Sequence, residues 1–118
     1  MNPHGLPDEQ EQFSTAADLS IIAKTADQQP EIRAIIKLQT YKFVRNDGKV
    51  VELSNTNRVL RTCGYCDGMK TGYTDASGYC LVASGEKNGK RRIVVVLNDT
   101  SSAVWRDAQA LLEWALKA

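Results

Sequence analysis

The strongest constraint on this fold is a run of three strand-like segments in the last third of the chain. They cover residues 68–74, 79–85 and 91–97. A turn containing Asp75 and Gly78 separates the first two, and Asn88-Gly89 separates the last two. Asn-Gly between apolar runs is the strongest short signal for a β-hairpin. The sequence therefore predicts a three-stranded antiparallel meander over 67–98.

The third strand and the segment after it predict how this sheet is covered. Residues 93–97 are all apolar, which is typical of a strand covered on both faces. Ser101 or Ser102 suits the N-cap of a final helix over 101–117. We expect this helix to pack on the sheet, with Trp105 and Trp114 as packing residues and Trp114 against the strands. The apolar stripe of the helix is Val104, Ala108, Leu111, Leu112 and Ala115.

The first half of the chain predicts two helices, a hairpin and two loops. Thr15 and Asp18 have the spacing of a helix start, and Pro30 suits a first helical position. Asn46-Asp47-Gly48 supplies hairpin turn chemistry. We expect loops at 1–13 and 54–66, helices at 15–27 and 30–37, and a hairpin at 38–53. A chain of 118 residues with this order of elements predicts a single α+β domain over 1–118.

Charge and hydropathy exclude several classes of partner. The formal net charge is +1 and both signs are scattered, so there is no electrostatic footprint for nucleic acid or anionic lipid. No apolar run approaches the ~20 residues needed to span a bilayer. Residues 1–7 have neither a basic segment nor an apolar one, so the polypeptide as written is expected to stay in the cytoplasm. No cofactor is expected.

Three interpretations of the cysteines remain open. Cys63, Cys66 and Cys80 could bind zinc together with His4, since two cysteines separated by two residues are a known ligand pair. Cys63 and Cys66 could instead form a redox pair or disulfide. The third interpretation is that all three thiols are incidental, which the odd number and the place of Cys80 on a core strand favour. His4 is expected to stabilise a turn.

Four segments, in order along the chain, carry a resemblance. Residues 67–74 read DGMKTGYT and are followed by GYCLVAS at 78–84. The other segments are NPHGL at 2–6 with STAADL at 14–19, NTNRVL at 55–60, and LLEW at 111–114. Together they closely resemble the serine-type D-Ala-D-Ala carboxypeptidases, the low-molecular-mass penicillin-binding proteins of bacteria. The chain looks like the C-terminal half of their catalytic domain, which implies a partial β-lactamase/transpeptidase-like fold.

The resemblance implies which residues bind substrate. The family hydrolyses the terminal D-Ala-D-Ala amide of peptidoglycan stem peptides through an acyl-enzyme on serine. By resemblance, Lys70 and Thr71 hold the substrate carboxylate and Gly72 lets the ligand approach the backbone. Tyr73 would supply a backbone N–H of the oxyanion hole. The expected ligands are a stem peptide or a β-lactam, and the family is periplasmic or otherwise extracytoplasmic.

The catalytic motifs of the family are missing from this stretch. Ser84-x-x-Lys87 matches the letters of the nucleophile motif Ser-x-x-Lys, but it lies where a strand enters the Asn88-Gly89 turn. Ser-x-Asn is absent, and the arginine that many relatives carry after the last strand is replaced by 98–101, NDTS. The chain is therefore expected to be inactive alone. The alternative is a truncated, non-catalytic binding or interaction protein with a vestigial site.

The missing half also predicts association. In the complete family fold, the strand 91–97 pairs with an N-terminal strand, and an unpaired apolar strand is a template for association. We expect a homo-oligomer, or a complex with the missing N-terminal half.

Overall fold

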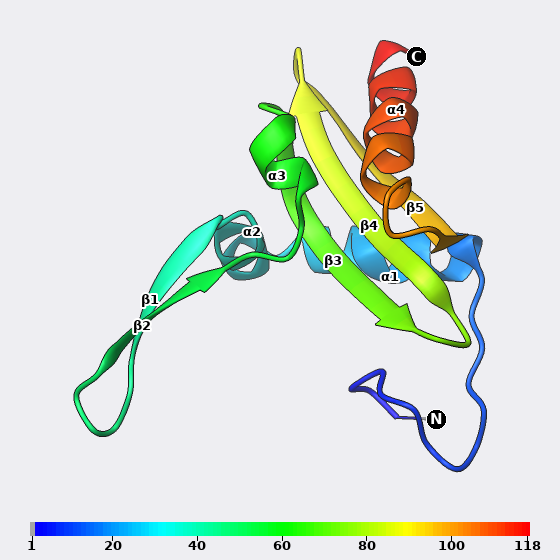
Figure 1. The fold of residues 1–118 in the computed structure, drawn as a ribbon. Helices are drawn as coiled ribbons and strands as arrows, with labels where there is room; N and C mark the ends of the chain where they lie inside the picture. Colours follow the sequence, from blue (N-terminus) through cyan, green and yellow to red (C-terminus); the bar gives the residue numbers. More distant parts are fainter. Residues whose placement is uncertain (1) are drawn as a thin grey trace.

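A computed structural model describes residues 2–118 and contains a three-stranded sheet, a separate hairpin and four helices within them (Figure 1). The helices are α1 Ala16–Asp27, α2 Pro30–Ile36, α3 Val59–Thr62 and α4 Val104–Lys117. The strands are β1 Thr40–Val44, β2 Val50–Ser54, β3 Cys66–Thr74, β4 Gly78–Lys87 and β5 Lys90–Asp99. The α+β class is confirmed.

The meander is confirmed, with strands a few residues longer than expected. β3, β4 and β5 pair antiparallel in that order, so β3 and β5 are the edge strands among the described residues. In the register between β3 and β4, Lys70 faces Val82 and Thr71 faces Leu81. β3 therefore has one edge that no other described strand covers.

Helices cover both faces of the sheet, as the apolar strand at 93–97 predicted. α4 packs across β4 and β5 on one face, and α1 lies behind β5 on the other (Figure 1). The core lies under α4, where Leu81 and Ala83 of β4 meet Val104, Ala108 and Leu112. The main core therefore lies between α4 and the two strands β4 and β5.

Three expectations for α4 are wrong. No serine side chain caps it; instead the backbone N–H of Ala103 donates to Thr100 Oγ1 at 3.2 Å. Leu111 is 38% exposed, and Leu116 takes its place in the core. Trp114 is 68% exposed and does not lie against the sheet, whereas Trp105 packs at the edge of the core. The helix is rotated so that its buried stripe follows Val104, Ala108, Leu112 and Leu116.

The expected surface loop at 54–66 is also wrong in part. It contains the single-turn helix α3, and Val59, Leu60 and Cys63 are buried there. Four residues are too few to show a helical period in the sequence. This short helix brings the preceding residues 55–58 against β3.

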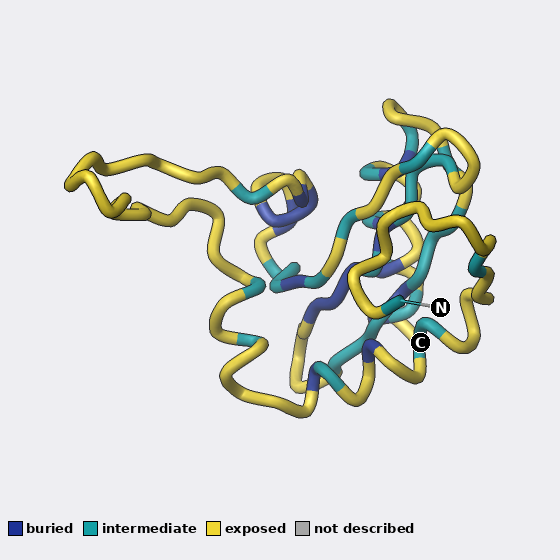
Figure 2. The backbone as a smooth tube through the Cα atoms, turned by 90° about the horizontal axis from the view of Figure 1, so that it is seen from below, coloured by how far each residue is buried: buried dark blue, intermediate teal, exposed yellow. Residues whose placement is uncertain are grey.

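The first half of the chain forms the expected elements. Thr15 caps α1 by accepting from the N–H of Asp18 at 3.1 Å, and α2 begins at Pro30. The hairpin pairs Thr40 with Ser54, and every residue of β1 and β2 is exposed (Figure 2). In the N-terminal loop, His4 Nδ1 accepts from the N–H of Leu6 at 3.1 Å, which fits its expected turn role.

Candidate functional site

The strand β3 carries the motif residues at an open sheet edge. Lys70 is exposed, and its ammonium donates to the backbone carbonyl of Thr71. An edge strand presents backbone donors and acceptors that an extended peptide can pair with. β3 is therefore able to receive an extended ligand with a cation beside it.

Thr71 lies at the rim of a cavity of about 450 Å³. We call it the Thr71 cavity; its walls include Thr56, Arg58, Thr71, Gly72, Tyr73 and Trp105. The hydroxyls of Thr56 and Thr71 are 2.9 Å apart and hydrogen-bonded. Lys70 is not part of this lining, so three of the four expected residues share the cavity and Lys70 stands beside it.

Two asparagines hold the loop that brings Thr56 to Thr71. Asn57 is buried, and its side-chain amide donates to the Gly68 carbonyl at 3.0 Å while its oxygen accepts from the N–H of Val59. Asn55 Oδ1 accepts from the N–H of Asn57 at 2.9 Å. Because these bonds join the loop to the start of β3, the position of Thr56 is fixed relative to Thr71.

A partly buried ionic network supports β3 from behind. Arg91 of β5 bonds Asp67 of β3 at 2.6 Å and also pairs with Asp27 of α1. Ser84 Oγ donates to Asp67 at 2.7 Å. Burial disfavours the ionised form of Asp67, but the bonds from Arg91 and Ser84 outweigh it and lower the pKa of that carboxyl. The same carboxylates raise the pKa of Arg91. The network ties α1 and all three strands together directly before Gly68.

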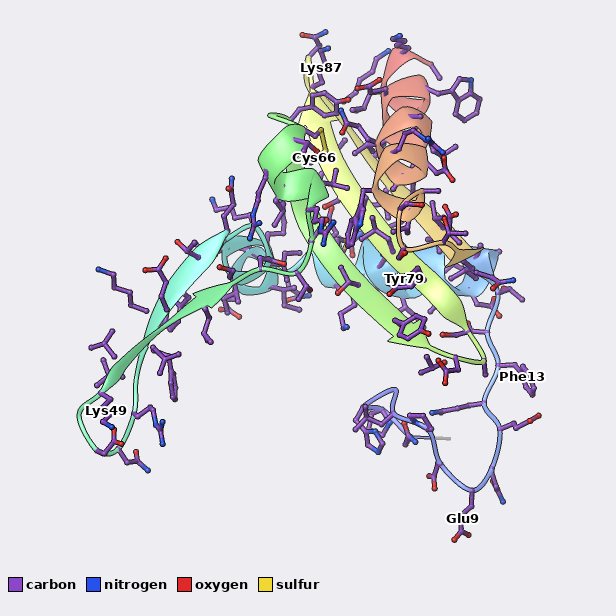
Figure 3. All side chains as sticks on the ribbon, viewed as in Figure 1. Glu9, Phe13, Lys49, Cys66, Tyr79 and Lys87 are labelled. Atoms are coloured by element: carbon purple, nitrogen blue, oxygen red, sulfur yellow. A yellow bond between two sulfur atoms is a disulfide. The ribbon has the colours of Figure 1, made fainter. Side chains whose placement is uncertain are left out.

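Gly72 and Tyr73 continue the strand beyond Thr71. A Cβ built on Gly72 would meet no atom within 4 Å, so open space faces this backbone. The Tyr73 ring lies 4.3 Å from that of Tyr79, and its hydroxyl donates to Asp75 at 2.7 Å. Figure 3 labels Tyr79 near the end of β4 that adjoins this region. The two tyrosines line the cavity at the end of the strand.

Ser84 is not arranged as a nucleophile. It is fully buried on β4, and its hydroxyl is engaged with Asp67. A nucleophilic serine needs access to the substrate and a base to take its proton. The match of Ser84-x-x-Lys87 to the nucleophile motif is therefore coincidental, as its position on a strand predicted.

The expectation that all three cysteines are incidental free thiols is wrong. Cys63 and Cys66 form a disulfide between the end of α3 and the start of β3, and Cys80 is free (Figure 3 labels Cys66). Because the disulfide takes two of the proposed ligands, the arrangement does not fit the Cys63, Cys66, Cys80 and His4 zinc site. Within residues 2–118, no three His, Cys, Asp or Glu side chains gather as a metal site.

Three contributors to the site were not expected from the sequence. Thr56 and Asn57 lie 15 and 11 residues from their partners on β3, and Arg91 lies 24 residues from Asp67. The resemblance of 55–60 to the loop that enters the family strand pointed to the right segment. It did not indicate which side chains turn toward β3.

Known proteins resemble this chain over most of its length. The family model described as D-alanyl-D-alanine carboxypeptidase matches residues 1–101. The D-alanyl-D-alanine carboxypeptidase DacF of Bacillus subtilis is 37% identical over 92% of this chain, and DacC of Escherichia coli is 36% identical over 97%. The chain spans 27% and 28% of the length of these relatives.

Solved structures show the same fold. The crystal structure of the Streptomyces K15 DD-transpeptidase matches with a TM-score of 0.82 and 31% identity, over 89% of this chain and 42% of that one. Penicillin-binding protein D2 of Listeria monocytogenes, in its ampicillin-bound form, matches with a TM-score of 0.79 and 28% identity, over 97% and 46%. The match is to part of a larger fold in each case. The chain belongs to the D-alanyl-D-alanine carboxypeptidase family.

Proposed function

We propose that residues 2–118 form the substrate-binding part of the catalytic domain of a serine-type D-Ala-D-Ala carboxypeptidase that acts on peptidoglycan stem peptides. The observation that carries the proposal is β3, an open sheet edge with exposed Lys70 beside the Thr71 cavity. A peptide ending in D-Ala-D-Ala would pair with this edge, with its carboxylate beside Lys70 and the Thr71 hydroxyl. Gly72 would admit the ligand, and the N–H of Tyr73 would serve the oxyanion hole.

The serine nucleophile would come from the rest of the catalytic domain. In residues 2–118, the one Ser-x-x-Lys sequence is the buried strand residue Ser84 with Lys87. The exposed apolar residues are consistent with a missing neighbour: Ile21 and Ile22 of α1 are 65% and 64% exposed, and Ile35 of α2 is 68% exposed. Covering such surfaces removes apolar area from water. The rest of the domain is our proposed partner for them.

The disulfide indicates in which cellular compartment the chain acts. Structural disulfides persist in oxidising surroundings and are rare in the cytoplasm. The Cys63–Cys66 bond therefore supports a site of action outside the cytoplasm, instead of the cytoplasmic location expected from residues 1–7. Among residues 2–118, no helix combines the length and apolarity needed to cross a bilayer.

Penicillin acylation tests whether this chain binds the substrate while another part of the domain supplies the nucleophile. The chain alone should gain no mass on incubation with penicillin. Mixed with the part of Bacillus subtilis DacF that lies outside the match, it should restore an adduct located on the DacF segment. A Lys70→Ala chain should restore much less, and Lys42→Ala, on the exposed hairpin, should match the unaltered chain. An adduct on the chain alone would reveal a nucleophile within these 118 residues and contradict the proposal.

A second candidate function follows from the buried Ser84. A chain without its own nucleophile could bind stem peptides or β-lactams without hydrolysing them. Reversible binding of a D-Ala-D-Ala peptide, with no acylation in any mixture with DacF segments, would favour this binding module over the enzyme part.

A further inference from the structure

Arg58 is a cation of the Thr71 cavity that the site described above leaves unused. It lies two residues after Thr56 and lines the cavity together with Thr71. Its guanidinium carbon is 5.7 Å from the centre of the Trp105 ring. Within residues 2–118 it pairs with no carboxylate. An unpaired arginine held at a cavity wall is a potential anion-binding group.

The surroundings hold Arg58 in place from two sides. Its chain neighbours Asn57 and Val59 are both buried, so the backbone at this position is anchored. Trp105, from the first turn of α4, supports the guanidinium. An arginine stacked on an aromatic ring keeps its N–H groups free in the plane of the guanidinium. Those groups can then bind a planar anion through two hydrogen bonds.

Other cations of this region already have partners, and Lys70, which would stand beside the same carboxylate, does not reach into the cavity. Arg61 also lines it, but its guanidinium lies 3.5 Å from the carbonyl of Asn55. Arg106 pairs with Asp107 at 3.7 Å. Lys70 lies outside the lining and donates to the Thr71 carbonyl. Arg58 therefore combines a place in the wall with a free guanidinium.

We propose that Arg58 binds the terminal carboxylate of the peptide substrate, together with the hydroxyls of Thr71 and Thr56. The proposal rests on the proposed function, because it assigns a residue to the same peptide. Thr71 presents its hydroxyl on the cavity side of β3, and Thr56 bonds that hydroxyl at 2.9 Å, which fixes its orientation. A carboxylate held by a hydroxyl and an arginine is discriminated from an uncharged amide of the same size.

Calorimetry with two matched peptides tests this assignment. The ligands are an acylated L-Lys-D-Ala-D-Ala peptide and the same peptide with a C-terminal amide. The affinity of the unaltered chain for the free acid should be at least about tenfold higher than its affinity for the amide. Arg58→Gln should lower the affinity for the acid about tenfold and leave the affinity for the amide unchanged. Arg58→Lys should recover part of the lost affinity for the acid. It restores the positive charge but lacks the planar guanidinium that can donate two parallel hydrogen bonds to a carboxylate.

Two controls separate binding from folding. Arg45→Gln removes an exposed arginine of the hairpin turn and should leave both affinities unchanged. In a Trp114→Phe background the emission comes from Trp105, and it should change when the acid binds but not when the amide binds. Arg58→Gln should still unfold in a cooperative thermal transition, which shows that the variant is folded.

The outcomes distinguish this inference from the proposed function. If the unaltered chain and Arg58→Gln bind the acid equally well, Arg58 has no part in recognition, while binding at β3 stands. If the unaltered chain binds neither peptide, the proposed function and this inference both fail. Equal losses for acid and amide in Arg58→Gln would show a structural effect and would overturn the carboxylate role.

Discussion

Two glycines of the motif, Gly68 and Gly72, have opposite surroundings. A Cβ on Gly68 would lie 2.6 Å from Ser84 Oγ and 2.9 Å from Ile36 Cδ1, whereas a Cβ on Gly72 would meet nothing. Gly68→Ala should therefore destabilise the fold by about 1–3 kcal/mol through overpacking. Gly72→Ala should leave stability unchanged within about 0.5 kcal/mol and weaken peptide binding.

Urea unfolding of both variants, with calorimetry on Gly72→Ala, checks this contrast. A stable Gly72→Ala chain that binds peptide normally would mean that the ligand does not approach the backbone at Gly72. Unchanged stability in Gly68→Ala would mean that β3 and α2 are less closely packed than the contact with Ile36 indicates.

The lowered pKa of Asp67 should make the stability of the fold depend on pH. Its pKa is lowered in the folded state by Arg91 and Ser84, against the opposing effect of burial. Ionised Asp67 therefore stabilises the fold in full above the ordinary aspartate pKa near 3.9. This contribution is lost as the pH falls through the lower pKa that Asp67 has in the folded state. Asp67→Asn should cost about 2 kcal/mol at pH 7, since it removes charged hydrogen bonds.

Urea unfolding from pH 7 down to pH 2 measures the effect. The stability difference between the unaltered chain and Asp67→Asn should narrow as the pH falls below about 4. A constant difference across this range would show that the charge of Asp67 does not contribute.

At the scale of residues, the motif could be read from the sequence but its supports could not. Lys70, Thr71 and Gly72 are adjacent, so their order identifies them directly. The partners of β3, such as Asn57 and Arg91, come from other elements, and their side chains meet it only after folding. The disulfide between Cys63 and Cys66 was one of several open interpretations, because spacing alone does not decide between metal, disulfide and free thiols.

Among the elements, α4 provides the sharpest prediction. Leu112 is fully buried between α4 and the sheet, while its neighbour Leu111 is 38% exposed. Leu112→Ala should cost about 2–5 kcal/mol because it leaves a cavity in the core. Leu111→Ala should cost well under half as much. Chemical denaturation of the two variants compares them directly, and equal losses would contradict the orientation of the helix described here.

The elements themselves were largely predictable, and the errors have physical causes. The turn at Asn88-Gly89 and the start at Pro30 are local signals, and both elements form where expected. The sequence does not determine the rotation of α4, because Leu111, Leu112 and Leu116 are all apolar and only packing in the core selects the last two. The apolar ring of Trp114 favours a place against the sheet, yet the side chain is largely exposed.

At the scale of the whole molecule, the exposed apolar surface predicts association. All residues of β1 and β2 are exposed, and the isoleucines of α1 and α2 are largely uncovered. We expect the chain by itself to self-associate at tens of micromolar through these faces or through the open edge of β5. Ile22→Lys combined with Ile35→Lys should shift the population toward monomer if the helix faces are used.

Sedimentation and light scattering measure this association. Arg106→Gln, on the exposed side of α4 and outside these surfaces, should leave the mass distribution unchanged. A strict monomer at tens of micromolar would show that these surfaces are tolerated in water and that no second copy covers them.

The partial nature of the fold was also evident from the sequence. Four ordered matches identified a portion of a larger domain, and the matched structures are covered to 42% and 46%. How the remaining domain sits against this chain depends on residues outside it. The proposed nucleophile belongs to that other part, so its position relative to Lys70 is set by residues that this sequence does not contain.

The proposed role of β3 is to bind the end of a D-Ala-D-Ala peptide. Titration calorimetry with an acylated L-Lys-D-Ala-D-Ala peptide, with its all-L counterpart as the reference ligand, tests it most directly. We predict saturable binding of the D-Ala-D-Ala peptide only, with affinity at least about tenfold weaker in Lys70→Ala and Thr71→Val and unchanged in Lys42→Ala. Equal binding of both peptides, or full affinity in Lys70→Ala, would contradict the account.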